Sequence, residues 1–149
     1  MKFRNLFVVA VLALITTGVY AGSASPVAVE VDLDNGFAQG DMVTSRYSSD
    51  KNEFIGCGSR HFDDGVFSLR FGFCQAKDQD GDQAVCFTEN PDLLDRIDGI
   101  SDFSFLTFGW IDDGFGGFEC VRIGFSTQSF YLPRGINANG NNGNGNGGE

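Results

Sequence analysis

The chain has 149 residues and a formal net charge of −10, with 20 acidic residues against 10 basic ones. A surface this anionic repels phosphate backbones and anionic lipid headgroups, which argues against nucleic acids and membrane surfaces as partners. The same charge favours solubility, cationic partners and divalent cations.

The first 21 residues are typical of a secretory signal peptide. Lys2 and Arg4 precede an apolar run over residues 6–15, and small or permissive side chains follow, so we expect cleavage after Ala21. The run is too short for the ~20 residues of a membrane-spanning helix, and no second run follows, so we expect no membrane span. Cleavage removes two basic residues and changes the net charge from −10 to −12. We expect a secreted or periplasmic protein.

The remaining sequence predicts one domain and a tail. Residues 135–149 are almost entirely Gly and Asn, and such a segment cannot offset its ordering entropy by burial, so we expect a disordered tail. Residues 22–134 then form a single disulfide-stabilised domain of ordinary size, with its folded body over 26–134. We expect this domain to be a monomer.

Alternating apolar and polar residues predict a mainly β structure. Asn90 as a helix cap and Pro91 at the first helical position predict one short helix that ends near Gly99. A strand is also predicted over 37–47, centred on Met42 and Val43. The sequence therefore predicts an all-β fold, either an antiparallel β-sandwich or a small open barrel with one short helix. The other predicted strands are 27–33, 53–62, 66–76, 83–88, 103–111 and 118–125.

Phenylalanine is the most enriched side chain, with 16 in the chain against one Trp and three Tyr. Sugar-binding surfaces favour Trp and Tyr, so this enrichment indicates core packing. In segment 66–76, Phe71 and Phe73 share one face of the strand with Leu69, and Arg70 lies on the other. We therefore expect the phenylalanine face to point into the core and Arg70 to face solvent.

Four cysteines follow the predicted signal, namely Cys57, Cys74, Cys86 and Cys120. An even number in an exported chain predicts two disulfides. A hairpin centred on Asp80 places Cys74 opposite Cys86, at a bridgeable separation, which favours Cys74–Cys86 with Cys57–Cys120. The pairing Cys57–Cys74 with Cys86–Cys120 remains open.

Several short motifs resemble a loose group of small exported bacterial proteins. They are residues 46–50, 55–57, 74–78 and 86–88, together with Pro91 and a terminal aromatic-Leu-Pro. These proteins share spaced cysteines and have no established activity. The resemblance therefore implies a cysteine framework and no site residues.

Alternate carboxylates in the turn at 78–82 make a candidate calcium site. Asp78, Asp80 and Asp82 could direct oxygens towards Ca²⁺, which prefers oxygen ligands. The match to an EF-hand loop is poor, because the glycine at 81 comes two residues early and Glu89, the twelfth residue from Asp78, follows a predicted strand. We carry the calcium site as an alternative to an ordinary polar turn, and we expect no other cofactor.

No catalytic motif is present, and His61 is the one histidine. We therefore expect a non-enzymatic module that binds an extracellular protein or glycan. An exposed aromatic patch made by Trp110, Phe115, Phe118 and Tyr131 is the candidate binding site. The alternatives are a calcium-dependent structural or adhesion domain, and a small hydrolase or enzyme inhibitor.

Overall fold

A computed structural model describes residues 23–133, so the predicted signal peptide and the predicted tail lie outside the described residues. The fold is mainly β, as predicted, with two short α-helices and one 3-10 turn. The elements in chain order are β1 (Glu30–Asp32), β2 (Phe37–Asp41), α1 (Met42–Arg46), β3 (Phe54–Asp63), β4 (Ser68–Lys77), β5 (Gln83–Thr88), α2 (Pro91–Asp98), β6 (Phe105–Asp112), β7 (Phe118–Ser126) and η1 (Ser129–Tyr131).

The strands form one mixed sheet in the order β1-β2-β6-β7-β5-β4-β3. Five of the six strand pairs are antiparallel, as expected, but β5 and β7 run parallel, with Phe87 opposite Glu119. The parallel pair arises because α2 carries the chain from β5 to β6, and the β6–β7 hairpin then returns beside β5. This parallel seam joins the β3–β5 part of the sheet to the rest.

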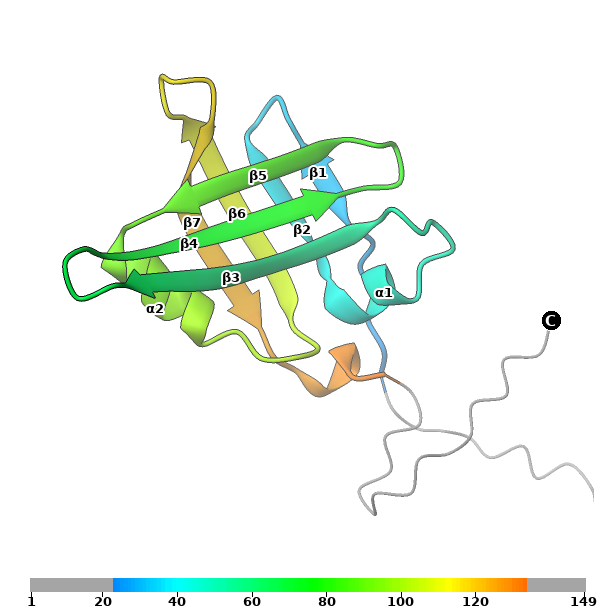
Figure 1. Ribbon diagram of the computed structural model, residues 1–149. Helices are drawn as coiled ribbons and strands as arrows, with labels where there is room; N and C mark the ends of the chain where they lie inside the picture. The colour runs from blue at the N-terminus through cyan, green and yellow to red at the C-terminus, as the bar shows by residue number, and fades with distance from the viewer. Residues whose placement is uncertain (1–22, 134–149) are drawn as a thin grey trace, which may run out of the picture.

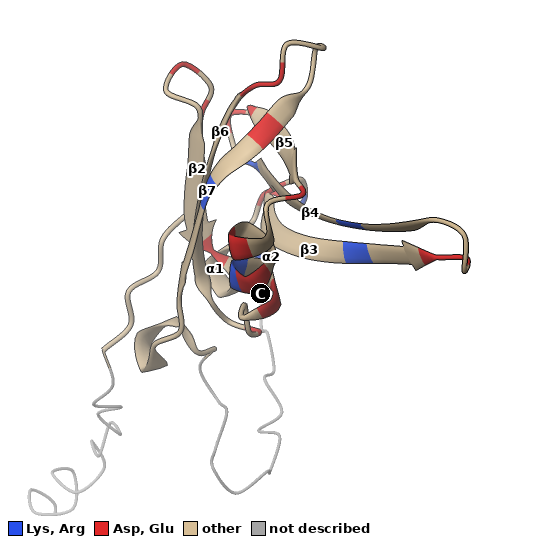
Figure 2. Ribbon diagram, turned by 90° about the vertical axis from the view of Figure 1, so that its left-hand side faces the viewer, with Lys and Arg blue, Asp and Glu red and all other residues tan. Residues whose placement is uncertain are grey.

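The sheet curls so that β3, β4 and β5 lie across β1, β2, β6 and β7 (Figure 1). As a result β1 contacts β4, and β2 contacts β3, although these strands are not neighbours in the sheet. The far end of the β3–β4 hairpin projects from the body and carries acidic residues at its tip (Figure 2). The core between the curled parts consists of Val29, Val31, Ala38, Ile55, Cys74, Ala76, Ala84, Cys86, Ile97, Leu106, Phe108, Trp110, Cys120 and Ile123.

One of the two α-helices, α2, was predicted from the sequence, and the other, α1, was not. Helix α2 is confirmed: the Asn90 side chain accepts a hydrogen bond from the Asp92 N–H, Pro91 follows, and Leu94 and Ile97 are buried. The predicted strand over 37–47 is wrong in its second half, where α1 begins. Asp41 caps this helix, since its carboxylate accepts the Thr44 N–H at 2.7 Å.

The faces of β4 are the reverse of the prediction. Gly72, Cys74 and Ala76 are buried against the core, whereas Phe71 and Phe73 lie half-exposed on the opposite face. The inward face has room only for small residues, because a Cβ on Gly72 would lie 2.4 Å from Ile97 Cδ1 of α2. Arg70 shares the inward face and pairs with Asp98 of α2, although both side chains stay partly exposed.

The phenylalanine enrichment does not build the core. Phe108 is the only phenylalanine within residues 23–133 that is fully buried. Most of the residues in the core cluster are instead aliphatic side chains and three of the four disulfide-bonded cysteines. Large aromatic rings are therefore left on the outside of the sheet, where their position needs a separate explanation.

The disulfides join Cys57 to Cys74 and Cys86 to Cys120. The predicted register was right, since Cys74 lies opposite Cys86 in the β4–β5 ladder. The favoured pairing was wrong, because Cys74 lies equally opposite Cys57 on its other neighbour, β3. Cys86 then bonds across the parallel seam to Cys120 of β7. Both bonds link adjacent strands, and together they indicate an oxidising compartment, extracellular or periplasmic.

Buried carboxylates hold the N-terminal segment at the sheet edge. The backbone N–H groups of Val27, Val29 and Val31 donate to Asp41 at 2.7 Å, Glu53 at 2.8 Å and Asp78 at 3.2 Å. All three carboxylates belong to buried residues. Alternate N–H groups of an edge segment point the same way, so a row of acceptors replaces a partner strand.

Replacing each cysteine pair with alanine should destabilise the protein unequally. The bridges close 17 and 34 residues, so loop-closure entropy predicts a loss of about 3 kcal/mol of unfolding free energy for C57A/C74A and about 4 kcal/mol for C86A/C120A. Denaturant titration measures both values. Mass spectrometry of unreduced peptides supplies the control, and a peptide pair linking Cys74 to Cys86 would contradict the connectivity.

Lowering the pH should reduce the unfolding free energy, because Glu53 at the sheet edge becomes protonated. Burial raises the pKa of Glu53, but hydrogen bonds from Ser48, the Val29 N–H and Gln79 outweigh it, so the pKa lies below its ordinary value. The folded protein therefore takes up this proton less readily than the unfolded chain. The stability that results is complete above the unfolded pKa of about 4.3 and is lost as the pH falls through the lower folded value.

We expect E53Q to lower the unfolding free energy at pH 7 by about 1–2 kcal/mol, because a charged acceptor of a buried N–H is lost. Its unfolding free energy should also fall less between pH 5 and 3 than that of the wild type, which urea titration at each pH would measure. E89Q is the matched control, because the Glu89 carboxylate is exposed and has no hydrogen-bond partner within residues 23–133. An E53Q protein with the wild-type pH slope would contradict this account.

Candidate functional site

Phenylalanine rings form a continuous row on the face of β3, β4 and β5 that points away from α2. We call Phe62, Phe71, Phe73 and Phe87 the phenylalanine face. The ring centroids of Phe62 and Phe71 are 6.1 Å apart, those of Phe71 and Phe87 are 6.1 Å apart, and those of Phe73 and Phe87 are 6.5 Å apart. Phe62 is 57% exposed and Phe87 is 52% exposed, so the row lies open to solvent within the described chain. Exposed apolar patches of several hundred Å² are candidates for interaction surfaces.

A hollow of about 520 Å³ adjoins the phenylalanine face where β5 meets β7. Phe71 and Phe87 form one part of its lining. Phe115, from the β6–β7 turn, is 97% exposed beside it. We call this the seam hollow, and its lining residues are Phe71, Phe87, Thr88, Glu89, Asp113, Phe115, Phe118 and Glu119.

The charged residues of the seam hollow are all acidic. Glu89 and Glu119 are exposed, and neither carboxylate has a hydrogen-bond or ion-pair partner in residues 23–133. Backbone hydrogen bonds from Phe115 and Gly117 lower the pKa of Asp113, which keeps this carboxylate ionised. We call the three carboxylates the acidic rim. Aromatic faces beside unpaired carboxylates attract organic cations.

The chain itself shows such a contact. The guanidinium carbon of Arg60 lies 5.1 Å from the centroid of the Phe73 ring, on the same face. This is within the range of a cation–π interaction. The phenylalanine face therefore already accommodates one cation at the end that lacks the acidic rim.

The structure does not bring together the four residues of the predicted aromatic patch. Trp110 is only 6% exposed and packs against Phe108 and Phe118 in the core. Tyr131 stacks on Phe105, with ring centroids 5.7 Å apart, in the C-terminal 3-10 turn. Phe115 and Phe118 do line a hollow, but with Phe71 and Phe87. Sequence reasoning missed Phe71 because it assigned this face of β4 to the core, and it missed Phe87 because it took the phenylalanine enrichment as core packing.

The three candidate calcium residues lie in different environments, one buried and two exposed. Asp78 is buried, and its oxygens accept the N–H groups of Val31 and Asp82, as expected of a residue that closes a turn. Asp80 and Asp82 are exposed at the β4–β5 turn. Within residues 23–133, no three His, Cys, Asp or Glu side chains lie close enough together to hold a metal ion.

The histidine lies in the projecting hairpin. His61 Nε2 is 3.1 Å from Ser68 Oγ, and both residues are exposed. A serine nucleophile also needs an acid that orients the histidine, and no carboxylate hydrogen-bonds to His61 in the described part of the chain. The pair therefore makes a cross-strand contact, and it does not form a serine–histidine–acid triad with a carboxylate of the described residues.

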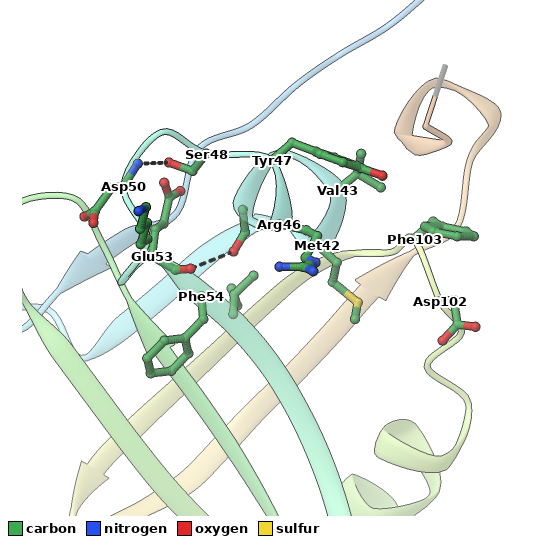
Figure 3. A pocket seen from close by; sticks show the side chains of 13 residues that line it. Met42, Val43, Arg46, Tyr47, Ser48, Asp50, Glu53, Phe54, Asp102 and Phe103 are labelled. Carbon is green, nitrogen blue, oxygen red and sulfur yellow. Dashed lines mark hydrogen bonds between the residues drawn. The ribbon is translucent and has the colours of Figure 1, made fainter. Parts of the chain in front are cut away.

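A second, larger hollow lies beside α1, at the end of β3 that is far from the β3–β4 turn (Figure 3). Its volume is about 690 Å³. The aromatic residues of its lining are Tyr47, Phe54 and Phe103. The charged ones are Arg46, Asp50, Lys51, Glu53 and Asp102. We call it the α1 hollow. None of its lining residues was predicted as a site. They come from residues 42–55 and 102–103, and the motifs at 46–50 and 55–57 implied only a cysteine framework.

Comparisons of the chain with protein families, curated proteins and solved structures find no match. The resemblance to a group of exported bacterial proteins therefore stays a prediction. Among residues 23–133, no helix has the length and apolar character that crossing a membrane requires. The two hollows and the phenylalanine face are therefore the candidate sites of this chain.

Proposed function

We propose that the protein is an exported, non-enzymatic binding module that captures a cationic protein segment on its phenylalanine face. The observation that carries the proposal is the exposed row of rings on β3–β5, which ends at the acidic rim. Apolar rings would contact the aliphatic part of the segment, and the rim carboxylates would pair with its lysine or arginine side chains.

A protein segment fits this surface better than a glycan. Sugar-binding platforms use Trp and Tyr, which combine an apolar face with a hydrogen-bonding group, and the exposed row contains only Phe. A second copy of the chain fits poorly as well. Two acidic rims would then meet across an interface between strongly anionic molecules, which like-charge repulsion opposes.

Removing rings from the seam hollow should weaken binding of a cationic peptide. The probe is an amphipathic peptide of lysine and leucine, measured by isothermal titration calorimetry. We expect F71S/F87S to raise Kd about tenfold or more, because aromatic anchors dominate the binding energy of interfaces. F67S is the matched control, because Phe67 is similarly exposed, at 60% against 52% for Phe87, but lies outside the hollow.

Two outcomes would contradict the proposal. Equal binding of a peptide with glutamate in place of lysine would show that the surface does not select cations. Self-association that F71S/F87S abolishes, measured by analytical ultracentrifugation, would show that a second copy occupies the face. Circular dichroism spectra should match the wild type, because the substituted rings are not part of the core.

Neutralising the acidic rim should reduce both affinity and salt dependence. We expect E89Q/E119Q to raise Kd for the lysine–leucine peptide several-fold in 50 mM salt and to flatten its change between 50 and 300 mM, since exposed charge pairs are screened by salt. D80N/D82N changes the net charge equally in the β4–β5 turn and should bind as the wild type does. Equal weakening by both variants would mean that bulk charge alone attracts the peptide.

A further inference from the structure

The α1 hollow has the dimensions and lining of a small-molecule site. At about 690 Å³ it lies within the usual range of about 300–1,000 Å³ for ligand pockets. Met42 and Arg46 of α1 lie side by side beneath the helix, with Phe54 to one side and Phe103 to the other (Figure 3). The hollow thus combines an apolar interior with a guanidinium group.

The walls of this hollow are held in place by the fold. The Met42 N–H donates to the Ser104 carbonyl oxygen at 3.1 Å, which fixes the loop before β6 against the first turn of α1. Phe103 in that loop has a φ of +66° and is the only described residue other than glycine with a positive φ. A bulky side chain in this region carries backbone strain, which persists where the surroundings enforce it and is frequent at ligand clamps.

Both cationic side chains that line the α1 hollow keep their hydrogen-bond donors free within residues 23–133. Arg46 has no hydrogen-bond or ion-pair partner among the described residues, and Lys51 is likewise free there. The carboxylates of the lining are largely occupied, since Glu53 accepts from Val29 and Gln79 and Asp50 accepts from the Asn52 N–H. The third acid, Asp102, lies apart from Arg46 (Figure 3).

We propose that the α1 hollow binds a small amphipathic carboxylate. Its carboxylate pairs with the Arg46 guanidinium, which matches the geometry of two carboxylate oxygens. Its apolar body, an aryl or short alkyl chain, packs between Met42, Phe54 and Phe103. This site is separate from the phenylalanine face, with no lining residue in common with the seam hollow, so either proposal can fail alone.

The test uses 4-phenylbutyrate as the anionic probe, with 4-phenylbutanol and 4-phenylbutylamine as its neutral and cationic counterparts. Binding to the full mature chain is measured by calorimetry and by chemical-shift changes in NMR spectra. We expect the carboxylate to bind saturably and R46Q to weaken it about tenfold. The neutral alcohol should bind the wild type more weakly than the carboxylate does. R46Q should bind the alcohol as tightly as the wild type does.

R96Q is the matched control, because Arg96 is exposed on α2, outside the hollow, and its loss changes the net charge by the same amount. R96Q should bind the carboxylate as the wild type does. F103S, whose amide spectrum reports whether the fold is intact, should weaken the carboxylate and the alcohol alike. The proposal is overturned if no saturable binding is found at millimolar probe, if R46Q and R96Q behave identically, or if the amine binds as tightly as the carboxylate.

Discussion

The placement of the cysteines on one face of the sheet is the constraint on which the rest of this structure depends. Cys57, Cys74 and Cys86 lie in register across three neighbouring strands, and Cys120 follows on β7. Side chains alternate between the two faces of a strand, so burying the sulfurs turns the flanking phenylalanines outward. The exposed aromatic row is therefore a direct consequence of the disulfide framework.

The sequence predicts the elements of this fold better than the direction in which their side chains point. The Asn90–Pro91 cap, the turn glycines and the period-two patterns are local signals, and they place α2 and most strands correctly. The assignment of faces failed because ring size was taken as the sign of burial. What decides the face of β4 is non-local, namely the close approach of Ile97 to Gly72 and the position of Cys57.

The candidate sites show the same division between local and distant information. Phe115 and Phe118 were singled out from the sequence, since they flank one turn, but their partners Phe71 and Phe87 come from strands that only the sheet order brings near. Arg46 belongs to the motif at 46–50, but that motif implied a cysteine framework and gave Arg46 no role, since its surroundings are not visible in the sequence. The strand predicted over Met42 also concealed the helix that presents it, since the capping role of Asp41 was not recognised.

The seam between β5 and β7 combines very short strand pairing with a covalent bond. Regular pairing there is confined to one residue pair, Phe87 with Glu119, whereas the Cys86–Cys120 bond crosses the same boundary covalently. Tension that pulls the three-stranded part from the four-stranded part is therefore borne by a sulfur–sulfur bond rather than by a long ladder of hydrogen bonds. Reduction of this bond would leave one strand pair, the shared core and the hydrogen bonds of Val29 and Val31 to Glu53 and Asp78 as the links between the two parts.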